Sequence, residues 1–417
     1  MPLPETGLSK DDIIATLTAK REGDARWQDG KTFGMVYDGG EDLHAVVEAV
    51  AAMFLHDNAL NTQAFPSLAQ IQSDVVGITA DLLHGGDTAA GFMTSGGTES
   101  ILCAVKAARE RAKAERGITA PEMVLPVSAH AAFHKAAYYF GLEVKRVPVD
   151  DAWKADVDAA AELVGPNTAL VVGSAPQYPQ GVIDPIPELA ALAQSVGASF
   201  HTDACMGGFV LPFMEQLGHE VAPWDFRIEG VTTISADLHK LGYAPKGASV
   251  VLHRTKELRR YQTFVFDDWL GGFYASPGMQ GTRAALPMAC AWATLHHLGL
   301  EGYVRLTTLT LEAHARLVAG IRAIPGLTVL GEPEAHLIAT AVAPGFEDAL
   351  DVFAVGDALL QRGWHLDRQH PPDSLHATVS AGNAPMVDQY LADLAECVEE
   401  VGGQRLADRS TTYSTLE

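Results

Sequence analysis

Cysteine, basic residues and long apolar runs are all scarce in this sequence. The chain has four cysteines among 417 residues and no C-x-x-C pair, which argues against a disulfide framework or a zinc site. Lysine and arginine together number 29, against 52 acidic residues, and the formal net charge is −23. Since binding to nucleic acid usually requires a basic surface, we do not expect a nucleic-acid partner.

Apolar stretches are too short for a transmembrane segment, which needs about 20 residues. Residues 46–55 are one of the longest aliphatic stretches, and the opening MPLPETGLSKDD lacks the apolar core of a signal peptide. Widely separated cysteines among small or apolar neighbours are typical of reduced thiols in the cytosol. We therefore expect a soluble, cytoplasmic protein, and peripheral contact with a membrane stays an open alternative.

The order of helical and strand patterns predicts an α/β fold. From about residue 58 to residue 285, helical stretches alternate with short β-branched runs, which is typical of a mostly parallel sheet flanked by helices. Two helical segments, 285–298 and 303–324, then precede shorter elements that suit a small α+β domain. Because 417 residues exceed what one small core holds, we predict three parts: an N-terminal arm (1–57), a large domain (58–300) and a small C-terminal domain (301–417).

A strand pattern followed by His-Lys is the first motif that carries chemistry. The β-branched run 231–235 ends in the polar sequence ADLHK, which finishes at Lys240. Ligands in α/β proteins gather at the carboxyl ends of strands, and a lysine desolvated there becomes nucleophilic enough to form an imine. A surface lysine after a strand is the alternative, and this motif alone leaves it open.

A second strand pattern, 199–202, ends in the carboxylate of Asp203. The pyridine nitrogen of pyridoxal 5′-phosphate (PLP) needs an anion beside it, because the protonated ring acts as the electron sink. The segment from Asp203 to Lys240 is long enough for one crossover back into the sheet. A helix N-cap aspartate is the alternative interpretation.

The segment TSGGTES (94–100) leads directly into an alanine-rich helical run. Its glycines, Gly96 and Gly97, let the backbone approach an anion, and the unpaired N–H groups of a helix N-terminus bind phosphate. Ser95 and Thr98 add hydroxyl donors. No lysine stands in the P-loop position, which argues against a nucleoside triphosphate, and a simple capping turn is the alternative.

A histidine, His130, follows the strand pattern 123–127 and opens a helical stretch. Its flat ring can stack on a cofactor, although a lone histidine at such a place is more often structural. The four motifs occur in an order that favours PLP: a phosphate cradle, a stacking histidine, a carboxylate for the ring nitrogen and a Schiff-base lysine. The combined pattern predicts a PLP enzyme that holds its cofactor on Lys240, with no metal site.

Nine longer segments are spread over nearly the whole chain. They are GKTFGMVY, NALNTQAFPSL, TSGGTES, SAHAAFHKAAYYFG, APQYPQGVIDPI, HTDACMGGFVLPF, ISADLHKLGYAPKG, GGFYASPGMQGTR and RGWHL. Together they resemble the sphingosine-1-phosphate lyase family, within the fold-type I, group II decarboxylase-like PLP enzymes. The most specific is ADLHKLGYAPKG, because related decarboxylases share His-Lys but usually lack the Gly-Tyr-Ala-Pro-Lys-Gly that follows.

The resemblance implies a fold-type I large domain, a homodimer with shared active sites, and a role for each matched residue. Lys240, preceded by His239, would be the Schiff-base lysine, Asp203 the partner of the ring nitrogen and His130 the stacking ring. Within one subunit the cofactor phosphate is assigned to Gly96, Gly97 and Thr98. From the neighbouring subunit, the resemblance assigns phosphate contacts to Tyr274, Ser276, Gly281 and Thr282.

The resemblance also implies substrate-binding residues. Tyr37 and Lys246 match positions tied to the substrate phosphate or to proton transfer. The family's Asn-x-Leu-His reads Asn58-Ala59-Leu60-Asn61 here, so Asn61 replaces a histidine expected to bind the substrate phosphate and carries no charge. Another departure is His134, where the family commonly has aspartate.

The implied reaction is the retro-aldol cleavage of a sphingoid base phosphate, such as sphingosine 1-phosphate, to a long-chain aldehyde and phosphoethanolamine. Lys246, Tyr37, His239 and Lys240 are candidate acids and bases, and the sequence does not rank them. The main alternative is a PLP-dependent amino-acid decarboxylase, in which Lys246 or Arg283 would serve the leaving carboxylate. A transaminase is less favoured, and a scaffold that has lost catalysis is a further alternative.

Overall fold

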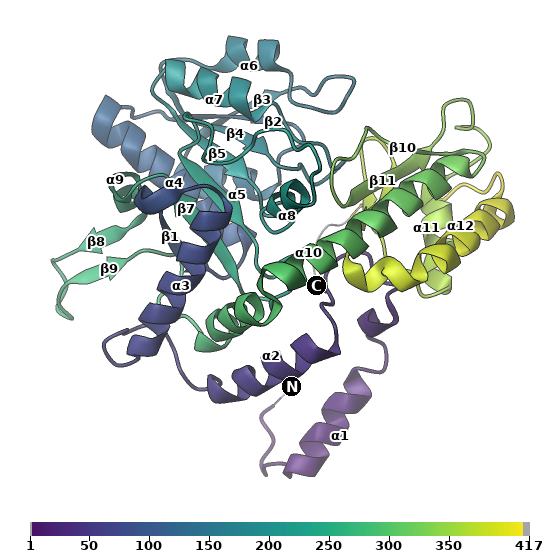
Figure 1. Cartoon of the computed structure of the whole chain (residues 1–417), viewed down its shortest axis with the longest axis horizontal. Coiled ribbons are helices and arrows are strands. Elements are labelled where there is room, and N and C mark those ends of the chain that lie inside the picture. The colour runs from purple at the N-terminus through teal and green to yellow at the C-terminus, as the bar shows by residue number, and fades with distance from the viewer. Residues whose placement is uncertain (1, 412–417) are drawn as a thin grey trace.

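A seven-stranded sheet forms the centre of the protein in the computed structural model, which describes residues 2–411. The strands lie in the order β1-β7-β6-β5-β4-β2-β3, with helices packed around them (Figure 1). Their bounds are β1 (Ala90–Thr94), β2 (Glu122–Pro126), β3 (Glu143–Val147), β4 (Thr168–Ser174), β5 (Ser199–Asp203), β6 (Thr233–Ala236) and β7 (Ser249–His253).

The strands of this sheet run parallel except β7, which pairs antiparallel with both β1 and β6. β4 and β5 are buried along their full length, as expected for parallel strands covered on both faces. The carboxyl ends of β1, β2, β4, β5 and β6 therefore meet at one edge of the sheet. Ligands in open α/β folds bind at this edge.

Helices alternate with these strands along the chain. Helix α4 packs against β4, β6 and β7, and α5 packs against α4. The helices of this part are α3 (Pro66–Leu82), α4 (Gly97–Arg116), α5 (Ala132–Phe140), α6 (Val157–Leu163), α7 (Ile186–Ser195), α8 (Leu211–Gln216) and α9 (Lys256–Arg259).

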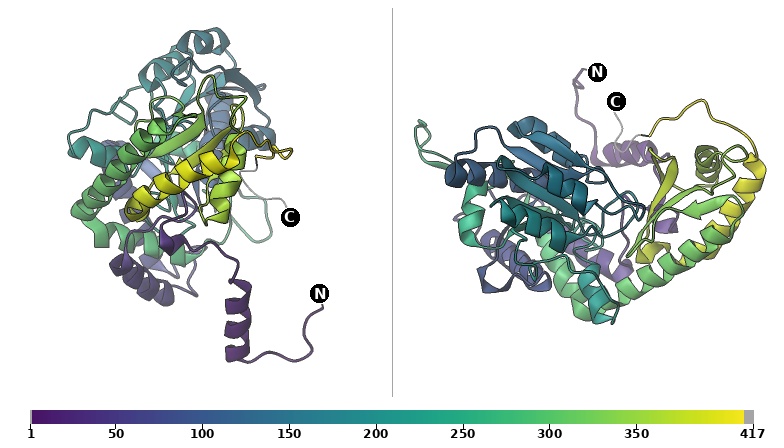
Figure 2. Two further views of the ribbon diagram at one scale, coloured as in Figure 1. Left: turned by 90° about the vertical axis from the view of Figure 1, so that its right-hand side faces the viewer. Right: turned by 90° about the horizontal axis from the view of Figure 1, so that it is seen from above.

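A smaller antiparallel sheet, in the order β10-β11-β13-β12, forms a second core with two helices. Its elements are β10 (Leu327–Val329), β11 (Leu337–Val342), α11 (Val352–Gln361), β12 (Asp367–Gln369), β13 (Ser374–Thr378) and α12 (Val387–Val401). The long helix α10 (Ala285–Ala323) runs from the large sheet to this part, as the view from above shows (Figure 2).

The N-terminal arm contains two helices, α1 (Lys10–Lys20) and α2 (Glu41–Met53). Each residue of α1 is exposed, and the helix projects from the body of the molecule (Figure 1). Between the two helices, Phe33 is buried in the second core against Trp364 and Tyr390. A parallel bridge from Thr32 to His365 holds this stretch in place.

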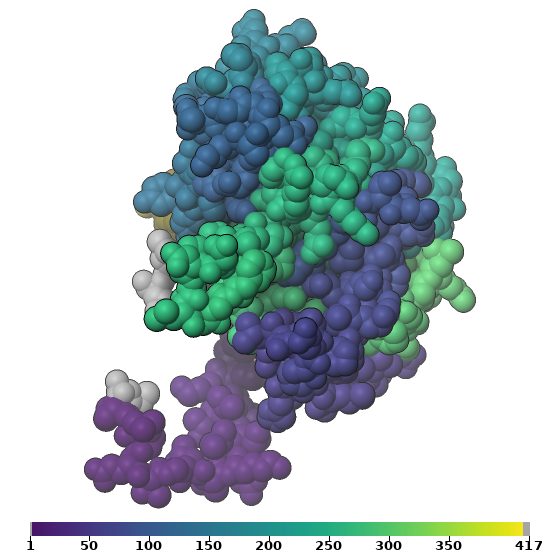
Figure 3. Space-filling model, turned by 90° about the vertical axis from the view of Figure 1, so that its left-hand side faces the viewer, coloured from purple at the N-terminus to yellow at the C-terminus, as the bar shows by residue number. Residues whose placement is uncertain are grey.

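An apolar hairpin extends from the large sheet. Its strands β8 (Phe264–Phe266) and β9 (Tyr274–Ser276) pair antiparallel, and the hairpin lies on the face that Figure 3 shows, in green. The large apolar side chains that it exposes to solvent are Phe264, Val265, Phe266, Trp269, Leu270, Phe273 and Tyr274.

The structure confirms the predicted fold class, a large mostly parallel sheet with a smaller C-terminal part. Two strands of the large sheet were not predicted from the sequence: β1 (AGFMT) is short and contains a glycine, and β3 (EVKRV) is a charged edge strand. The short strands β8, β9 and β12 were not predicted either. The two helical segments predicted around residue 300 are the two halves of α10, which are separated by a kink at Gly299 (φ 54°). The three-part division stays a prediction. Within residues 2–411, no helix is long and apolar enough to cross a membrane.

Candidate active site

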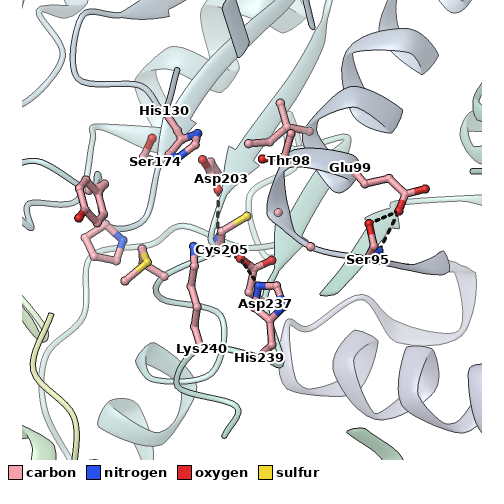
Figure 4. A pocket seen from close by; sticks show the side chains of 16 residues that line it. Ser95, Thr98, Glu99, His130, Ser174, Asp203, Cys205, Asp237, His239 and Lys240 are labelled. Carbon is pink, nitrogen blue, oxygen red and sulfur yellow. Dashed lines mark hydrogen bonds and ion pairs between the residues drawn. The ribbon is translucent and has the colours of Figure 1, made fainter. Parts of the chain in front are cut away.

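A cavity of about 330 Å³ lies at the carboxyl edge of the large sheet. It is formed by the segments that follow β1, β2, β4, β5 and β6, and Figure 4 shows side chains from these segments directed into it. The lining residues are Ser95, Gly96, Gly97, Thr98, Glu99, Ile101, His130, Ser174, Pro176, Tyr178, Asp203, Cys205, Met206, Asp237, His239 and Lys240. Five separate chain segments thus converge on one space because the strands end together.

The glycine turn after β1 exposes the N-terminus of α4 to this cavity. α4 begins at Gly97, and its N-cap residue is Gly96. Within residues 2–411, no side chain makes a capping hydrogen bond at this end of the helix. A Cβ atom at Gly97 would lie 2.8 Å from both Asp237 Oδ2 and Cys205 Sγ, so a larger residue does not fit there without a shift. The first N–H groups of a 20-residue helix and its positive dipole end therefore face the cavity.

A buried ion pair lies at the end of β6. Lys240 Nζ is 3.0 Å from Asp237 Oδ2, and the Asp237 side chain is almost fully buried. Burial by itself raises the pKa of Asp237, but the Lys240 charge and His239 outweigh it and hold that pKa well below its ordinary value. Asp237 is therefore ionised in the folded protein.

The ring of His239 is fixed by the backbone. Its Nδ1 accepts hydrogen bonds from the N–H groups of Gly247 (3.1 Å) and Ala248 (3.3 Å). The proton of a neutral ring is therefore on Nε2, which lies 3.5 Å from Asp237 Oδ2. This arrangement makes His239 a support for Asp237.

Asp203 and His130 lie at the ends of β5 and β2. Asp203 Oδ1 accepts hydrogen bonds from Cys205 N (3.1 Å) and Ser235 Oγ (3.2 Å), which fix the carboxylate. His130 Nδ1 accepts one from Ala132 N (3.1 Å). Burial lowers the pKa of His130, and the charge of Lys240 lowers it further, against the opposing charge of Asp203. The imidazole is therefore neutral near pH 7.

These residues fit PLP. The uncapped helix N-terminus suits its phosphate, Lys240 Nζ its aldehyde carbon, Asp203 its ring nitrogen and the His130 ring its face. No group of histidine, cysteine and carboxylate side chains suitable for a metal occurs within residues 2–411.

Lys246 and Tyr37 form a second group beside the cavity. Lys246 Nζ donates to the carbonyl oxygen of His239 (2.9 Å) and lies 4.6 Å from the centre of the Tyr37 ring. Lys246 retains an exposed surface, but desolvation by the atoms packed around it and the charge of Lys240 lower its pKa to about 8, although Asp237 opposes the shift. A lysine with this pKa exchanges its proton near neutral pH.

The remaining sequence-predicted residues lie away from this cavity in the same chain. Tyr274 and Ser276 belong to β9, on the exposed hairpin. Asn58 pairs with Ala284 in an antiparallel bridge, which places residues 58–61 beside the segment that contains Gly281 and Thr282. The Oδ1 atoms of Asn58 and Asn61 accept hydrogen bonds from Leu60 N and Gln63 N in local turns.

Sequence reasoning missed several residues that line the cavity. Asp237 and Glu99 belong to the motifs ADLHK and TSGGTES. The sequence of a polar segment does not show which cation or N–H group a carboxylate contacts in the folded chain. Tyr178 follows β4 in the segment APQYPQG, and its OH donates to Asp367 Oδ2 of the small sheet (2.9 Å). Its position relative to the other motifs does not predict that it lines the cavity.

Comparison with known proteins identifies the family. Residues 12–340 match the model of the pyridoxal-dependent decarboxylase conserved domain. A sphingosine-1-phosphate lyase of Arabidopsis thaliana is 44% identical over 96% of this chain and 74% of its own length. The chain belongs to the sphingosine-1-phosphate lyase family. A yeast (Saccharomyces cerevisiae) family member is 36% identical over 96% of this chain and 68% of its own.

Solved structures agree with this membership of the sphingosine-1-phosphate lyase family. A lyase of this name from Burkholderia pseudomallei superposes with a TM-score of 0.90 at 40% identity, covering 96% of this chain and 92% of that one. A glutamate decarboxylase of Lactobacillus brevis has a TM-score of 0.84 at 21% identity, covering 98% and 96%, which shows a shared fold alone. The family is pyridoxal-dependent, so the cofactor of this chain is PLP.

Gly97→Ala tests the phosphate cradle. The added Cβ would displace Asp237 or Cys205, so we expect the affinity of the apoprotein for PLP to fall by about tenfold, which corresponds to ~1.4 kcal/mol. Absorbance titration of apoprotein with PLP measures this affinity. Gly165→Ala is the matched control, because a Cβ there meets no described atom within 4 Å. Unchanged affinity in Gly97→Ala would contradict the assignment of the cradle.

Proposed function

We propose that this protein is a PLP-dependent carbon–carbon lyase, an aldehyde-lyase that cleaves phosphorylated sphingoid bases such as sphingosine 1-phosphate. The products are a long-chain aldehyde and phosphoethanolamine. The observation that carries the proposal is the Lys240 amine beside Asp237, Asp203 and His130, in a chain 44% identical to a protein named sphingosine-1-phosphate lyase. The decarboxylase alternative is supported only by the shared fold.

The polar groups around the Lys240 amine have binding or orienting roles in this proposal. Bound PLP supplies an electron sink for the pair released when the C2–C3 bond breaks. Lys240 Nζ would hold the cofactor, Asp203 would keep the proton on the ring nitrogen, and the His130 ring would cover one face. The N–H groups of Gly97, Thr98 and Glu99 would bind the cofactor phosphate.

The contacts of the four candidate acids and bases support different roles for them. His239 Nδ1 accepts a hydrogen bond from the backbone, and its Nε2 lies beside Asp237. We therefore assign His239 a positioning role. Lys246 and Tyr37, which contact each other, would bind the substrate phosphate. Lys240 is then the group best placed to move protons at the reacting carbons, because its Nζ lies inside the cavity (Figure 4).

A homodimer with shared active sites completes this proposal. The apolar side chains of the β8–β9 hairpin are exposed in the single chain, and Trp269 and Phe273 are 57% and 71% exposed. Contiguous exposed apolar surface of this kind marks an interaction site. A second copy would cover it and receive Tyr274, Ser276, Gly281 and Thr282 at its own cavity. Asn58 and Asn61, bridged to the same segment, would reach the partner's substrate.

We also propose a cytoplasmic location. The four cysteines are buried, free thiols, which is typical of a reducing compartment.

A product assay tests the function directly. Purified, PLP-loaded protein given a phosphorylated sphingoid base should release long-chain aldehyde and phosphoethanolamine in equal amounts, because cleavage yields one of each. Lys240→Ala should abolish both products, whereas Lys113→Ala, on the exposed side of α4, should retain them. Release of carbon dioxide from amino acids without aldehyde formation would establish the decarboxylase instead.

The pH dependence of substrate binding tests Lys246. This lysine is charged below its pKa of about 8 and loses the charge above it, so attraction for the substrate phosphate is present below that pH. We expect KM to rise as pH increases from about 7 to about 9. Steady-state kinetics with Lys246→Gln should show a higher KM and little change across the same interval. A KM for the unmodified protein that is constant or falls over this interval would refute the role.

Asn61→His tests the departure from the family pattern. A histidine adds a charge-assisted hydrogen bond near the substrate phosphate, so we expect KM to fall by about fivefold below about pH 6.5, where the ring is protonated. The value of kcat should stay constant, since the phosphate lies away from the reacting bond. Asn167→His, at an exposed site, serves as the control. Equal KM values in Asn61→His and the unmodified protein would remove Asn61 from the substrate site.

A further inference from the structure

Glu99 joins the glycine turn after β1 to the segment that follows β9. Its Oε2 accepts hydrogen bonds from Ser95 N (2.8 Å) and Ser95 Oγ (2.7 Å). Its Oε1 accepts a third from Met279 N (2.8 Å). The side chain is 5% exposed, so the carboxylate obtains its stabilisation from these three donors and from the N-terminus of α4.

The segment that Glu99 holds is the return of the apolar hairpin. Gly278 packs directly against it, since a Cβ there would lie 3.0 Å from Glu99 Oε1 and 2.9 Å from the Phe92 ring. The side chain of Gln262 donates to the carbonyl oxygen of Pro277. Residues 277–279 therefore have little freedom to move independently of Glu99.

The same helix also holds the beginning of the hairpin. Lys106 Nζ donates to the carbonyl oxygens of Tyr261 (2.8 Å), Gln262 (3.0 Å) and Thr263 (3.2 Å). Positions 99 and 106 are two turns apart on one face of a helix. Helix α4 thus fixes both ends of the excursion 261–279, and its N-terminus faces the cavity.

We propose that Glu99 is a positioning residue that couples PLP binding to dimer assembly. The inference rests on the homodimer of the proposed function. Through Ser95, Glu99 sets the turn that would bind the cofactor phosphate, and through Met279 it sets the segment that the dimer interface would use. If dimer formation orders the segment at Met279, the glycine turn at Ser95 is ordered with it, because Glu99 binds both. Because such coupling is reciprocal, PLP tightens the dimer to the same extent that the dimer tightens PLP.

The replacement Glu99→Gln removes this double contact with little change in volume. An amide has one acceptor oxygen, and its NH₂ group would oppose the N–H of either Ser95 or Met279. One of the two segments is thereby released. Glu162→Gln is the control, because Glu162 is an exposed residue of α6, which packs on α7, β2 and β3.

The experiment measures the dimer dissociation constant by sedimentation velocity, with and without PLP, for the full chain and each variant. PLP should lower this constant by about tenfold in the unmodified protein and in Glu162→Gln. In Glu99→Gln the change should fall below about threefold, while the circular dichroism spectrum stays that of the unmodified protein. Lyase activity is not part of the measurement, so failure of the substrate assignment leaves this test intact.

Two outcomes would overturn the proposal. One is a tenfold effect of PLP that persists in Glu99→Gln. The other is an unmodified protein that stays monomeric, or whose dimer is indifferent to PLP. If Glu99→Gln does not fold, Ser95→Ala removes one of the three donors, and PLP should then lower the dimer dissociation constant by less than in the unmodified protein. A PLP effect in Ser95→Ala equal to that of the unmodified protein would also refute the coupling.

Discussion

The parallel strands of the large sheet end at one edge, and the whole active site depends on that alignment. Residues from five segments reach the cavity only because β1, β2, β4, β5 and β6 point the same way. Hydrogen bonds along fully buried strands such as β4 and β5 hold these ends rigidly. A rigid frame matters here because the Asp237 carboxylate is almost fully buried beside Lys240, and a buried charge is stable only while its partner stays in place.

Much of this site follows from local sequence. Asp203 ends β5, the glycine turn follows β1, and Lys240 and His130 lie a few residues after β6 and β2. A strand pattern in the sequence was therefore enough to place Asp203, Lys240 and His130 at the ligand-binding edge. Tyr178 and Asp237 could not be assigned in this way. Their importance comes from contacts made in the folded chain, with Asp367 of the small sheet and with Lys240.

The fold shows the same distinction between local pattern and tertiary context. Buried strands such as β4 have continuous apolar sequence, whereas the edge strand β3 carries charged residues that resemble a loop. The residues predicted from family resemblance to contact cofactor and substrate, such as Tyr274 and Asn61, lie outside the cavity of their own chain. Packing within one chain does not place these residues in its own cavity, since the groups that they are proposed to contact belong to a second copy.

The placement of Phe33 has a consequence for the order in which the protein acquires structure during synthesis. Its ring is part of the second core, and the side chain of Asn383 donates to the carbonyl oxygens of Gly30 and Thr32 from 353 and 351 positions away. During synthesis, the strands of the large sheet are complete before Trp364 and Tyr390, which pack against Phe33, have been added to the chain. This stretch must wait for almost the entire chain, so native packing of the second core is a late event in biogenesis.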